Sequence, residues 1–254
     1  MLNTAGRTGY SSDHDAFRDS LRRFMAREYL PYLDQWEAEG IIPRSFWLAA
    51  GEAGLICPNV PEEYGGPGLD FRFNAVTDEE FGYLGSIPGI CLQSDITAEY
   101  FVAYGSDEQK RQYLPRMVTG EIVTAIAMTE PGAGSDLQGI RTTAKRDGDH
   151  YIINGSKTYI TNGQHADLVI VVARTAPDGG SKGTSLILVE ADRTGFKRGR
   201  NLDKIGCHSA DTSELFFEDV CVPTTNLLGP EHAGFACLMN QLPQERLAVA
   251  IYAQ

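Results

Sequence analysis

The sequence lacks the marks of a membrane-spanning, secreted or metal-binding protein. Its longest strongly apolar run, residues 168–173, is too short to cross a bilayer. The start of the chain has no apolar signal core and is not rich in arginine. The five cysteines are odd in number and widely spaced, which indicates a reducing compartment, the bacterial cytoplasm or, in a eukaryote, the mitochondrial matrix. The histidines form no HExxH or HxH pair, so we expect no metal site.

Positive charge is also scarce. Lys and Arg number 22 against 34 Asp and Glu, which gives a formal net charge of −12 over 254 residues. No block of basic residues offsets this balance, which argues against a general nucleic-acid binder, although a local cluster of donors could still hold a small anion. Apolar residues make up 42% of the chain, which is enough for a buried core without disulfides.

The first part of the chain, residues 1–120, has the pattern of a helical domain. Apolar residues at helical spacing follow Ser12, and a long helix is predicted over residues 89–104. Thr77 has the sequence context of a helix start. Ser106 and Gln109 have capping-box spacing and predict a further helix that ends at Leu114, just before Pro115.

Residues 121–230 have the pattern of a strand-rich middle domain. Short β-prone runs alternate with turn dipeptides, among them Asn154-Gly155 and Asn162-Gly163. Several short strands with such turns predict an antiparallel β-barrel or sandwich. The chain has no GxGxxG motif and no alternating βαβ pattern, which argues against a Rossmann domain.

Residues 231–254 return to helical spacing. Pro243 either begins a second helical segment or kinks one long helix. The apolar pattern is still running at Gln254, so we expect the start of an incomplete C-terminal helical domain that continues in the natural protein or is covered by a partner chain. A terminal helix that packs back on the body is the alternative. The expected fold class is therefore α+β and multidomain.

Two stretches carry candidate chemistry. In residues 127–136, Gly132 and Gly134 let the backbone approach a ligand, and Thr129 and Ser135 add hydroxyl groups. Such a loop suits a flat, electron-poor ring or a phosphate, and a plain tight turn is an equally good interpretation. In residues 155–163, the two-residue period of a strand points Tyr159 and Thr161 the same way. They could stack on a ring and bond its edge, although packing inside a barrel is the commoner role of such residues.

Together these stretches resemble the acyl-CoA dehydrogenase family, most nearly its long-chain type. The resemblance implies a helical N-terminal domain, a middle β-barrel domain and a C-terminal four-helix bundle. It rests on motifs that occur in the family's order: Pro-Glu-Glu-Tyr-Gly-Gly at 61–66, Gly-Ser-Asp-Glu-Gln at 105–109, Met-Thr-Glu-Pro-Gly-Ala-Gly-Ser-Asp at 128–136, Asn-Gly-Ser-Lys at 154–157, Tyr-Ile-Thr-Asn-Gly at 159–163, Asp-Thr-Ser-Glu-Leu-Phe-Phe-Glu at 211–218 and Gln-Leu-Pro-Gln-Glu-Arg at 241–246.

The resemblance implies FAD as cofactor and places particular residues against it. Thr161 is implied to lie near flavin N5, and Ser135 also near the acyl-CoA. Many family members have Trp where Tyr159 stands. The residues that the resemblance places against FAD are Met128, Thr129, Gly134, Ser135, Tyr159, Ile160 and Thr161. Ser181 and Lys182 stand where some members meet the CoA moiety, although a solvated lysine explains Lys182 equally well.

The resemblance also implies the reaction. Glu245, in the sequence Gln-Glu-Arg-Leu, matches the family's base that removes the α-proton of an acyl thioester, and Arg246 would orient the thioester end of CoA. The alternatives are a surface glutamate and a surface arginine on an amphipathic helix. The implied activity is FAD-dependent oxidation of a fatty acyl-CoA to trans-2-enoyl-CoA in β-oxidation, with hydride transfer to flavin N5. An electron-transfer flavoprotein would accept the electrons, and the full-length form would be a homo-oligomer, a dimer or a tetramer.

Other functions remain open at this point. An acyl-CoA oxidase, a nitroalkane oxidase or a flavin monooxygenase could share the scaffold, and a non-catalytic binding protein could retain the first two domains without the bundle. Because the family's bundle supplies part of the FAD site, we expect the 254-residue chain alone to bind FAD weakly and to be nearly inactive. The Pro-Gln-Glu-Arg context favours straight acyl chains of medium to long length.

Overall fold

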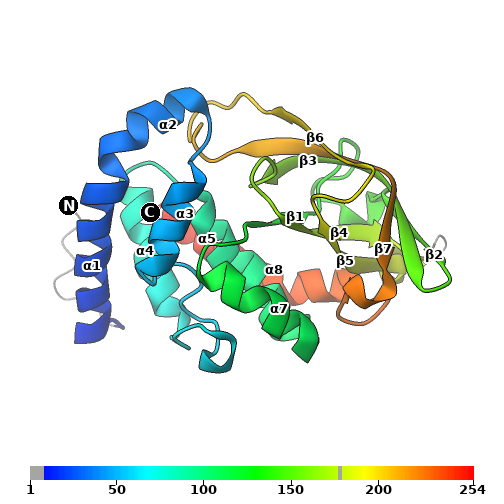
Figure 1. Ribbon diagram of the computed structural model, residues 1–254, viewed down its shortest axis with the longest axis horizontal. Coiled ribbons are helices and arrows are strands. Elements are labelled where there is room, and N and C mark those ends of the chain that lie inside the picture. The colour runs from blue at the N-terminus through cyan, green and yellow to red at the C-terminus, as the bar shows by residue number, and fades with distance from the viewer. Residues whose placement is uncertain (1–8, 177–178) are drawn as a thin grey trace.

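The computed structural model describes residues 9–176 and 179–254, apart from the side chain of Ser181. A helical part comes first, a sheet follows, and one long helix, α8 (Gly234–Tyr252), passes back along both (Figure 1). No helix among the described residues is long and apolar enough to cross a membrane. The helical part consists of α1 (Ser12–Glu28), η1 (Leu30–Tyr32), α2 (Leu33–Glu39), α3 (Arg44–Glu52), η2 (Glu62–Tyr64), α4 (Phe71–Tyr83), α5 (Gly89–Leu92), the π-helix η3 (Gln93–Thr97), α6 (Ala98–Tyr104) and α7 (Asp107–Val118).

Local signals set most helix starts. The predicted capping box of α7 is present, because Ser106 Oγ accepts a hydrogen bond from the backbone N–H of Gln109 at 3.2 Å and Gln109 Oε1 accepts one from Ser106 N at 3.0 Å. The predicted end at Leu114 is wrong. The helix continues through Pro115 to Val118, because a proline removes only one backbone hydrogen bond when the rest of the helix is held by packing.

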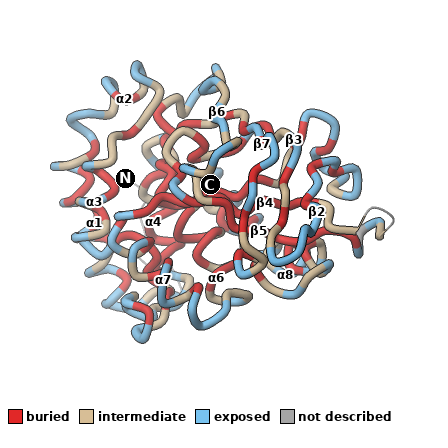
Figure 2. Tube along the Cα trace, turned by 45° about the vertical axis from the view of Figure 1, so that its right-hand side comes forward, coloured by how far each residue is buried: buried red, intermediate tan, exposed pale blue. Residues whose placement is uncertain are grey.

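The predicted helix start at Thr77 is also wrong. The helix α4 begins at Phe71, and its N-cap is Asp70, which accepts a hydrogen bond from Arg72 N at 2.9 Å. Thr77 lies inside the helix and donates to the carbonyl of Phe73. Most residues of α4 are buried, as Figure 2 shows, so its sequence lacks the polar face that would have marked it as one surface helix.

The sheet is open and mixed, which corrects the expected antiparallel barrel. Its eight strands follow the order β6-β7-β3-β2-β4-β5-β8, with β1 paired to β4. The β2–β3 and β4–β5 hairpins are antiparallel, as expected from the turn signals Asp147-Gly148 and Asp-Gly-Gly at 178–180, whereas β1 and β2 pair with β4 in parallel. The hairpin predicted from Asn162-Gly163 is wrong, because it joins β3 to β4 and these strands do not pair. Turn residues report only on neighbouring strands, so they could not reveal these longer connections. The strands are β1 (Thr124–Ala127), β2 (Thr143–Asp147), β3 (His150–Thr161), β4 (Leu168–Arg174), β5 (Thr184–Glu190), β6 (Phe196–Asn201), β7 (Thr212–Pro223) and β8 (Leu227–Leu228).

The strand β3 is longer and less regular than its sequence predicted. Asn154-Gly155 is not a turn but a register shift within β3, opposite β7. A Cβ at Gly155 would lie 2.4 Å from Thr142 Oγ1, so glycine is required there. A second shift lies between Lys157 and Ile160, and Tyr159 within it has a φ of 59°. The strict two-residue alternation assumed for Tyr159 and Thr161 is therefore interrupted by a bulge.

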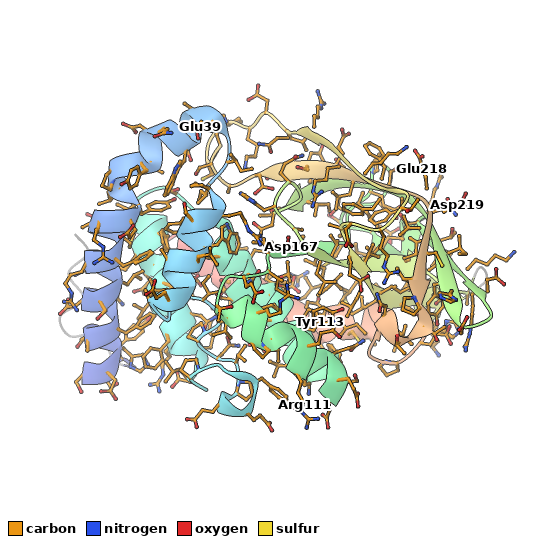
Figure 3. The ribbon with its side chains drawn as sticks, in the orientation of Figure 1. Glu39, Arg111, Tyr113, Asp167, Glu218 and Asp219 are labelled. Carbon is orange, nitrogen blue, oxygen red and sulfur yellow. The ribbon has the colours of Figure 1, made fainter. Side chains whose placement is uncertain are left out.

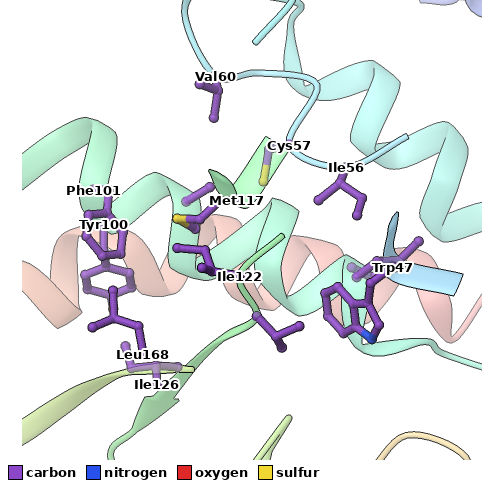
Figure 4. Close-up of a cluster of buried hydrophobic side chains, with 14 of the residues drawn as sticks. Trp47, Ile56, Cys57, Val60, Tyr100, Phe101, Met117, Ile122, Ile126 and Leu168 are labelled. Atoms are coloured by element: carbon purple, nitrogen blue, oxygen red, sulfur yellow. The ribbon is translucent and has the colours of Figure 1, made fainter. Parts of the chain in front are cut away.

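One apolar core joins the helices to the sheet. Tyr100 and Phe101 of α6 lie in the same cluster as Ile126 of β1 and Leu168 of β4 (Figure 4). The alternate residues of β4, among them Val169, face a second cluster on the other side of the sheet. Burial on both faces explains why β4 is a continuous apolar run.

Charged side chains also tie the two parts together. Asp167, which lies between α7 and the sheet in Figure 3, accepts hydrogen bonds from Arg44 Nη2 at 2.7 Å and from Val123 N at 2.8 Å. Glu37 of α2 accepts the backbone N–H groups of His208 and Ser209. These contacts fix the position of the helical part relative to the sheet.

Candidate active site

An apolar cavity of about 340 Å³ lies between α8, the α5–η3 segment and the end of β3. The side chains of Asp95 and Glu245 are the acidic groups in its wall. Thr161, the last residue of β3, also lines it, so one predicted cofactor residue and the predicted base share a cavity. The lining residues are Ile87, Pro88, Gly89, Leu92, Asp95, Ile96, Thr161, Glu245, Ala248, Val249, Tyr252 and Ala253.

Glu245 reaches the cavity because α8 is one uninterrupted helix. Pro243 lies within this helix, so the alternative in which Pro243 begins a second helical segment is wrong. Residues 245, 248, 249 and 252 recur at spacings of three and four and so line the same side of the helix. The side chain of Glu245 is only 9% exposed.

The carboxyl group of Glu245 is held by Tyr100 of α6. The Tyr100 hydroxyl donates a hydrogen bond of 2.8 Å to Oε1 of Glu245. Burial raises the pKa of Glu245 above its usual value, while this hydrogen bond and the charge of Arg246 oppose the rise. A carboxyl group with a raised pKa in an apolar cavity has the properties of a general base.

The loop after β1 is held against β3 by a buried ion pair that the sequence did not reveal. Lys157 Nζ lies 2.9 Å from Glu130 Oε1 and donates a second hydrogen bond of 2.9 Å to the carbonyl of Met128. Glu130 also accepts the backbone N–H groups of Arg141 and Thr142, at 2.7 and 2.9 Å. This pair therefore fixes Met128 and Glu130, which flank Thr129, against the strand that carries Tyr159.

The electrostatics of the pair show how deeply it is buried. Burial lowers the pKa of Lys157 to about 8, although Glu130 opposes the shift. Burial acts to raise the pKa of Glu130, but Lys157 and the donors of Thr142 and Arg141 hold it below its usual value. The sequence shows a lysine inside a β-strand but does not show that Glu130 is its partner, because this contact depends on the conformation of the loop after β1.

The loop beyond Glu130 leaves groups open to a ligand. Glu130 and Ala133 exchange backbone hydrogen bonds and form a tight turn. Beyond this turn Gly134 and Ser135 are exposed, and a Cβ at Gly134 would have no heavy atom within 4 Å. The backbone of Gly134 can therefore be approached closely from solvent.

Tyr159 lies next to this loop. Thr158 N donates a hydrogen bond of 3.0 Å to the carbonyl of Thr129, which brings the two predicted cofactor segments side by side. The Tyr159 ring is 69% exposed on a backbone with positive φ, an unusual conformation for an aromatic residue that is found most often at functional sites. Ile160 is buried, so its side chain belongs to the sheet core and only its backbone can face a ligand.

The remaining predicted residues are not brought into the cavity. Lys182 is exposed in η5 (Gly180–Gly183), which packs beside α8 and precedes β5. The side chain of Ser181 lies outside the described part of the structure. Arg246 is exposed on α8, and its charge acts on Glu245 without a hydrogen bond between them among the described contacts.

Comparisons with known proteins agree with this arrangement. The family profile described as "Acyl-CoA dehydrogenase, N-terminal domain" matches residues 11–121, and the one described as "Acyl-CoA dehydrogenase, middle domain" matches residues 125–220. A helical N-terminal domain followed by a mixed-sheet middle domain matches the fold of this class of protein, and the chain belongs to the acyl-CoA dehydrogenase family.

Individual relatives show how much of the family's length is present. The chain is 51% identical over 244 residues to the long-chain specific acyl-CoA dehydrogenase of Rattus norvegicus mitochondria, covering 95% of this chain and 57% of the rat protein. The crystal structure of an acyl-CoA dehydrogenase from Geobacillus kaustophilus matches with a TM-score of 0.94 and 52% identity, covering 96% and 65% of the two chains. An acyl-CoA dehydrogenase from Bacillus anthracis, solved in complex with FAD, matches with a TM-score of 0.87 and 35% identity, covering 96% and 42%.

Proposed function

We propose that this chain provides the helical and middle domains of an FAD-dependent enzyme that oxidises a fatty acyl-CoA to its trans-2-enoyl-CoA. The observation that carries the proposal is the position of Glu245, a buried carboxyl group in an apolar cavity whose wall also includes Thr161. A base beside a hydrophobic cavity suits a long acyl chain whose α-carbon, next to the thioester, carries the proton to be removed.

The described residues fit a flavin. The backbone at Gly134, the residue Ser135 and the ring of Tyr159 are all exposed, on two segments that a hydrogen bond from Thr158 N to the carbonyl of Thr129 holds together. In our proposal Met128, Thr129, Gly134 and Ser135 hold the loop side of FAD, while Tyr159, Ile160 and Thr161 hold its ring. When bound, FAD supplies the acceptor for the hydride that leaves the β-carbon. The relative from Bacillus anthracis, described with FAD, supports this cofactor.

The chain's own residues account for the proton transfer. Glu245 takes the α-proton of the thioester, and the burial of its side chain among apolar residues limits the access of water to its carboxyl group. Tyr100 fixes the orientation of Oε1 through its hydroxyl group. A general base positioned in this way contributes about 10²–10⁴-fold to a rate.

The wider assignments are part of the same proposal. They include a division at residues 1–120, 121–230 and 231–254, with the last segment as the start of a C-terminal helical domain. They also include an electron-transfer flavoprotein as electron acceptor, a homo-oligomeric enzyme, a CoA contact at Ser181, Lys182 and Arg246, and a role in fatty acid β-oxidation. The long-chain rat relative supports a long acyl substrate.

The proposal is tested by adding palmitoyl-CoA under anaerobic conditions to the FAD-loaded protein. The measurement is made on this chain and, where the coding sequence continues, on the whole gene product. We expect the flavin absorbance of the whole gene product to bleach, with and without the control substitution Glu63→Gln at an exposed residue, whereas the 254-residue chain alone should hold little FAD and bleach slowly. Glu245→Gln should retain the flavin and lose the bleaching. Bleaching at the unchanged rate in Glu245→Gln would refute the assigned base, and rapid peroxide formation in air would indicate an acyl-CoA oxidase.

A further inference from the structure

Two acidic side chains that the proposed chemistry does not use are buried together beside the cavity. Asp78 of α4 is 0% exposed and Asp95 of the π-helix η3 is 2% exposed. Asp95 Oδ1 accepts a hydrogen bond of 2.9 Å from Asn74 Nδ2, and its Oδ2 accepts one of 3.0 Å from the hydroxyl of Tyr252. Asp78 lies one turn along α4 from Asn74, its carboxyl group faces Asp95, Tyr252 and Cys91, and no N–H group of the described residues bonds its oxygens.

No cation of the described residues pairs with these two carboxyl groups. Among the described residues, no Lys, Arg or His side chain forms an ion pair with either carboxyl group. The titratable groups that face the pair are acidic or neutral: Cys91 on α5, Glu99 on α6 and Tyr252 on α8. Burial raises the pKa of both aspartates, and their mutual repulsion raises that of Asp78 further. Two such groups cannot both ionise, so the pair retains a proton at neutral pH.

The pair is joined directly to the helix that carries the proposed base. Tyr252 bonds the side chain of Asp95, and Gln244 Nε2 donates a hydrogen bond of 3.1 Å to the backbone carbonyl of Asp95. These two contacts hold α8 at both ends of the segment that includes Glu245. Close packing supports them, since a Cβ on Gly82 of α4 would lie 2.7 Å from the carbonyl oxygen of Tyr252.

The π-helix is a second, independent sign of function at this position. The segment Gln93–Thr97 is wound with one extra residue per turn inside an otherwise α-helical stretch. Such segments are rare and occur often at functional sites. Here the segment places both the side chain and the carbonyl group of Asp95 toward α8.

We propose that Asp78 and Asp95 share one proton and act as positioning residues for Glu245, by holding α8 through Tyr252 so that the Glu245 carboxyl group stays buried in the wall of the cavity. The functional meaning of this inference rests on the proposed role of Glu245 as base. The shared proton and the position of α8 do not depend on that role, so they can be tested without turnover.

The shared proton is tested by infrared spectroscopy and by unfolding at a series of pH values. A protonated carboxylic acid in the folded chain has its own carbonyl stretch, which Asp78→Asn should remove at pH 7. Because both folded pKa values lie above the ordinary aspartate value, the folded chain binds more protons than the unfolded chain above about pH 4. The free energy of unfolding should therefore fall as pH rises, and Asp78→Asn should reduce this fall. The exposed control Asp147→Asn should change neither result. An unchanged spectrum and slope in Asp78→Asn would overturn the shared proton.

The positioning of Glu245 is tested by its own titration. Its infrared band is assigned by its loss in Glu245→Gln. Tyr252→Phe should loosen α8, admit water and lower the pKa of Glu245. Gly82→Ala should also lower the pKa of Glu245, but the infrared band of the shared proton should remain. This variant therefore separates the effect of helix packing from the effect of the aspartate pair. A Glu245 pKa that stays unchanged in both folded variants would overturn the positioning role.

Kinetics then distinguish this inference from the proposed function. In the FAD-loaded protein, Tyr252→Phe should lower kcat for palmitoyl-CoA by up to about 100-fold, because the base is misplaced; KM should change less than kcat, since the substitution removes one hydroxyl group and leaves the ring in the cavity wall. If Glu245→Gln remains fully active while the titration shifts as expected, the proposed function fails and the positioning stands. If Glu245→Gln is inactive and the pKa of Glu245 does not shift in the α8 variants, the proposed function stands and the positioning role fails.

Discussion

The hydroxyl group of Tyr100 donates a 2.8 Å hydrogen bond to Oε1 of Glu245, from a residue 145 positions earlier in the chain. The bond stabilises the ionised carboxylate in a cavity that otherwise disfavours it. The two residues come from α6 and α8, so the packing of these helices determines the properties of the proposed base.

Replacing Tyr100 with Phe removes this donor and leaves the ring. A hydrogen bond to a charged group contributes about 1.5–3 kcal/mol, so the pKa of Glu245 should rise by about one to two units. The basic form is then less populated at neutral pH, and the pH profile of kcat should move to higher pH. Tyr104→Phe is the matched control, because Tyr104 lies one turn later and donates to the carbonyl of Cys237 instead. A pH profile that Tyr100→Phe leaves in place would contradict the role of this bond.

The buried pair Lys157–Glu130 should be important for stability. Lys157→Met leaves Glu130 as an unpaired buried charge, which should cost about 3–5 kcal/mol in the free energy of unfolding. The double variant Glu130→Gln with Lys157→Met should recover part of this loss, because no charge is then left unpaired. Urea unfolding followed by circular dichroism measures both. A loss below about 1 kcal/mol in Lys157→Met would show that the pair is solvated.

The same lysine predicts a pH dependence. Burial lowers its pKa from 10.5 to about 8, so between these values the unfolded chain binds more protons than the folded chain. This group alone therefore makes the free energy of unfolding rise with pH from about 8 to 10.5. The slope of the unchanged protein in this window should exceed that of Lys157→Met. Equal slopes would indicate a lysine of ordinary pKa.

Gly134 distinguishes a ligand-binding loop from a plain turn. A Cβ there meets nothing within 4 Å, so Gly134→Val should leave thermal stability unchanged. If FAD approaches this backbone, the same substitution should raise the Kd for FAD by about tenfold or more. Gly206→Val is the control, because Gly206 is equally open and has no positive φ. Equal FAD affinity in both variants would make the loop a turn with no role in cofactor binding.

Local chemistry in the sequence was enough for part of this structure. The capping box at Ser106, the helical run over residues 89–104 apart from its π-helical segment, and the β2–β3 and β4–β5 hairpins follow from residues close together in the chain. The parallel pairs of β4 and the bulge at Gly155 depend on contacts with distant segments, and the turn signal of Asn154-Gly155 was misleading for that reason.

The candidate site divides in the same way. Glu245, Tyr159 and Thr161 could be selected by their resemblance to a family. Tyr100, Lys157 and Asp95 could not, because each acquires its partner only when helices or loops far apart in sequence pack together. The signals that could have found them are weak: a lysine inside an apolar strand and an aspartate inside an apolar helix, both needing a partner once buried.

The exchange of α-hydrogens tests the central claim most directly, because it reports on proton removal alone. The FAD-loaded protein is incubated with palmitoyl-CoA in deuterated water, and deuterium at the α-carbon is followed by mass spectrometry. We expect rapid exchange with the unchanged protein and with Glu63→Gln, and a loss of about 100-fold or more with Glu245→Gln. Exchange in Glu245→Gln at the rate of the unchanged protein would contradict the account, because another group would then be removing the proton.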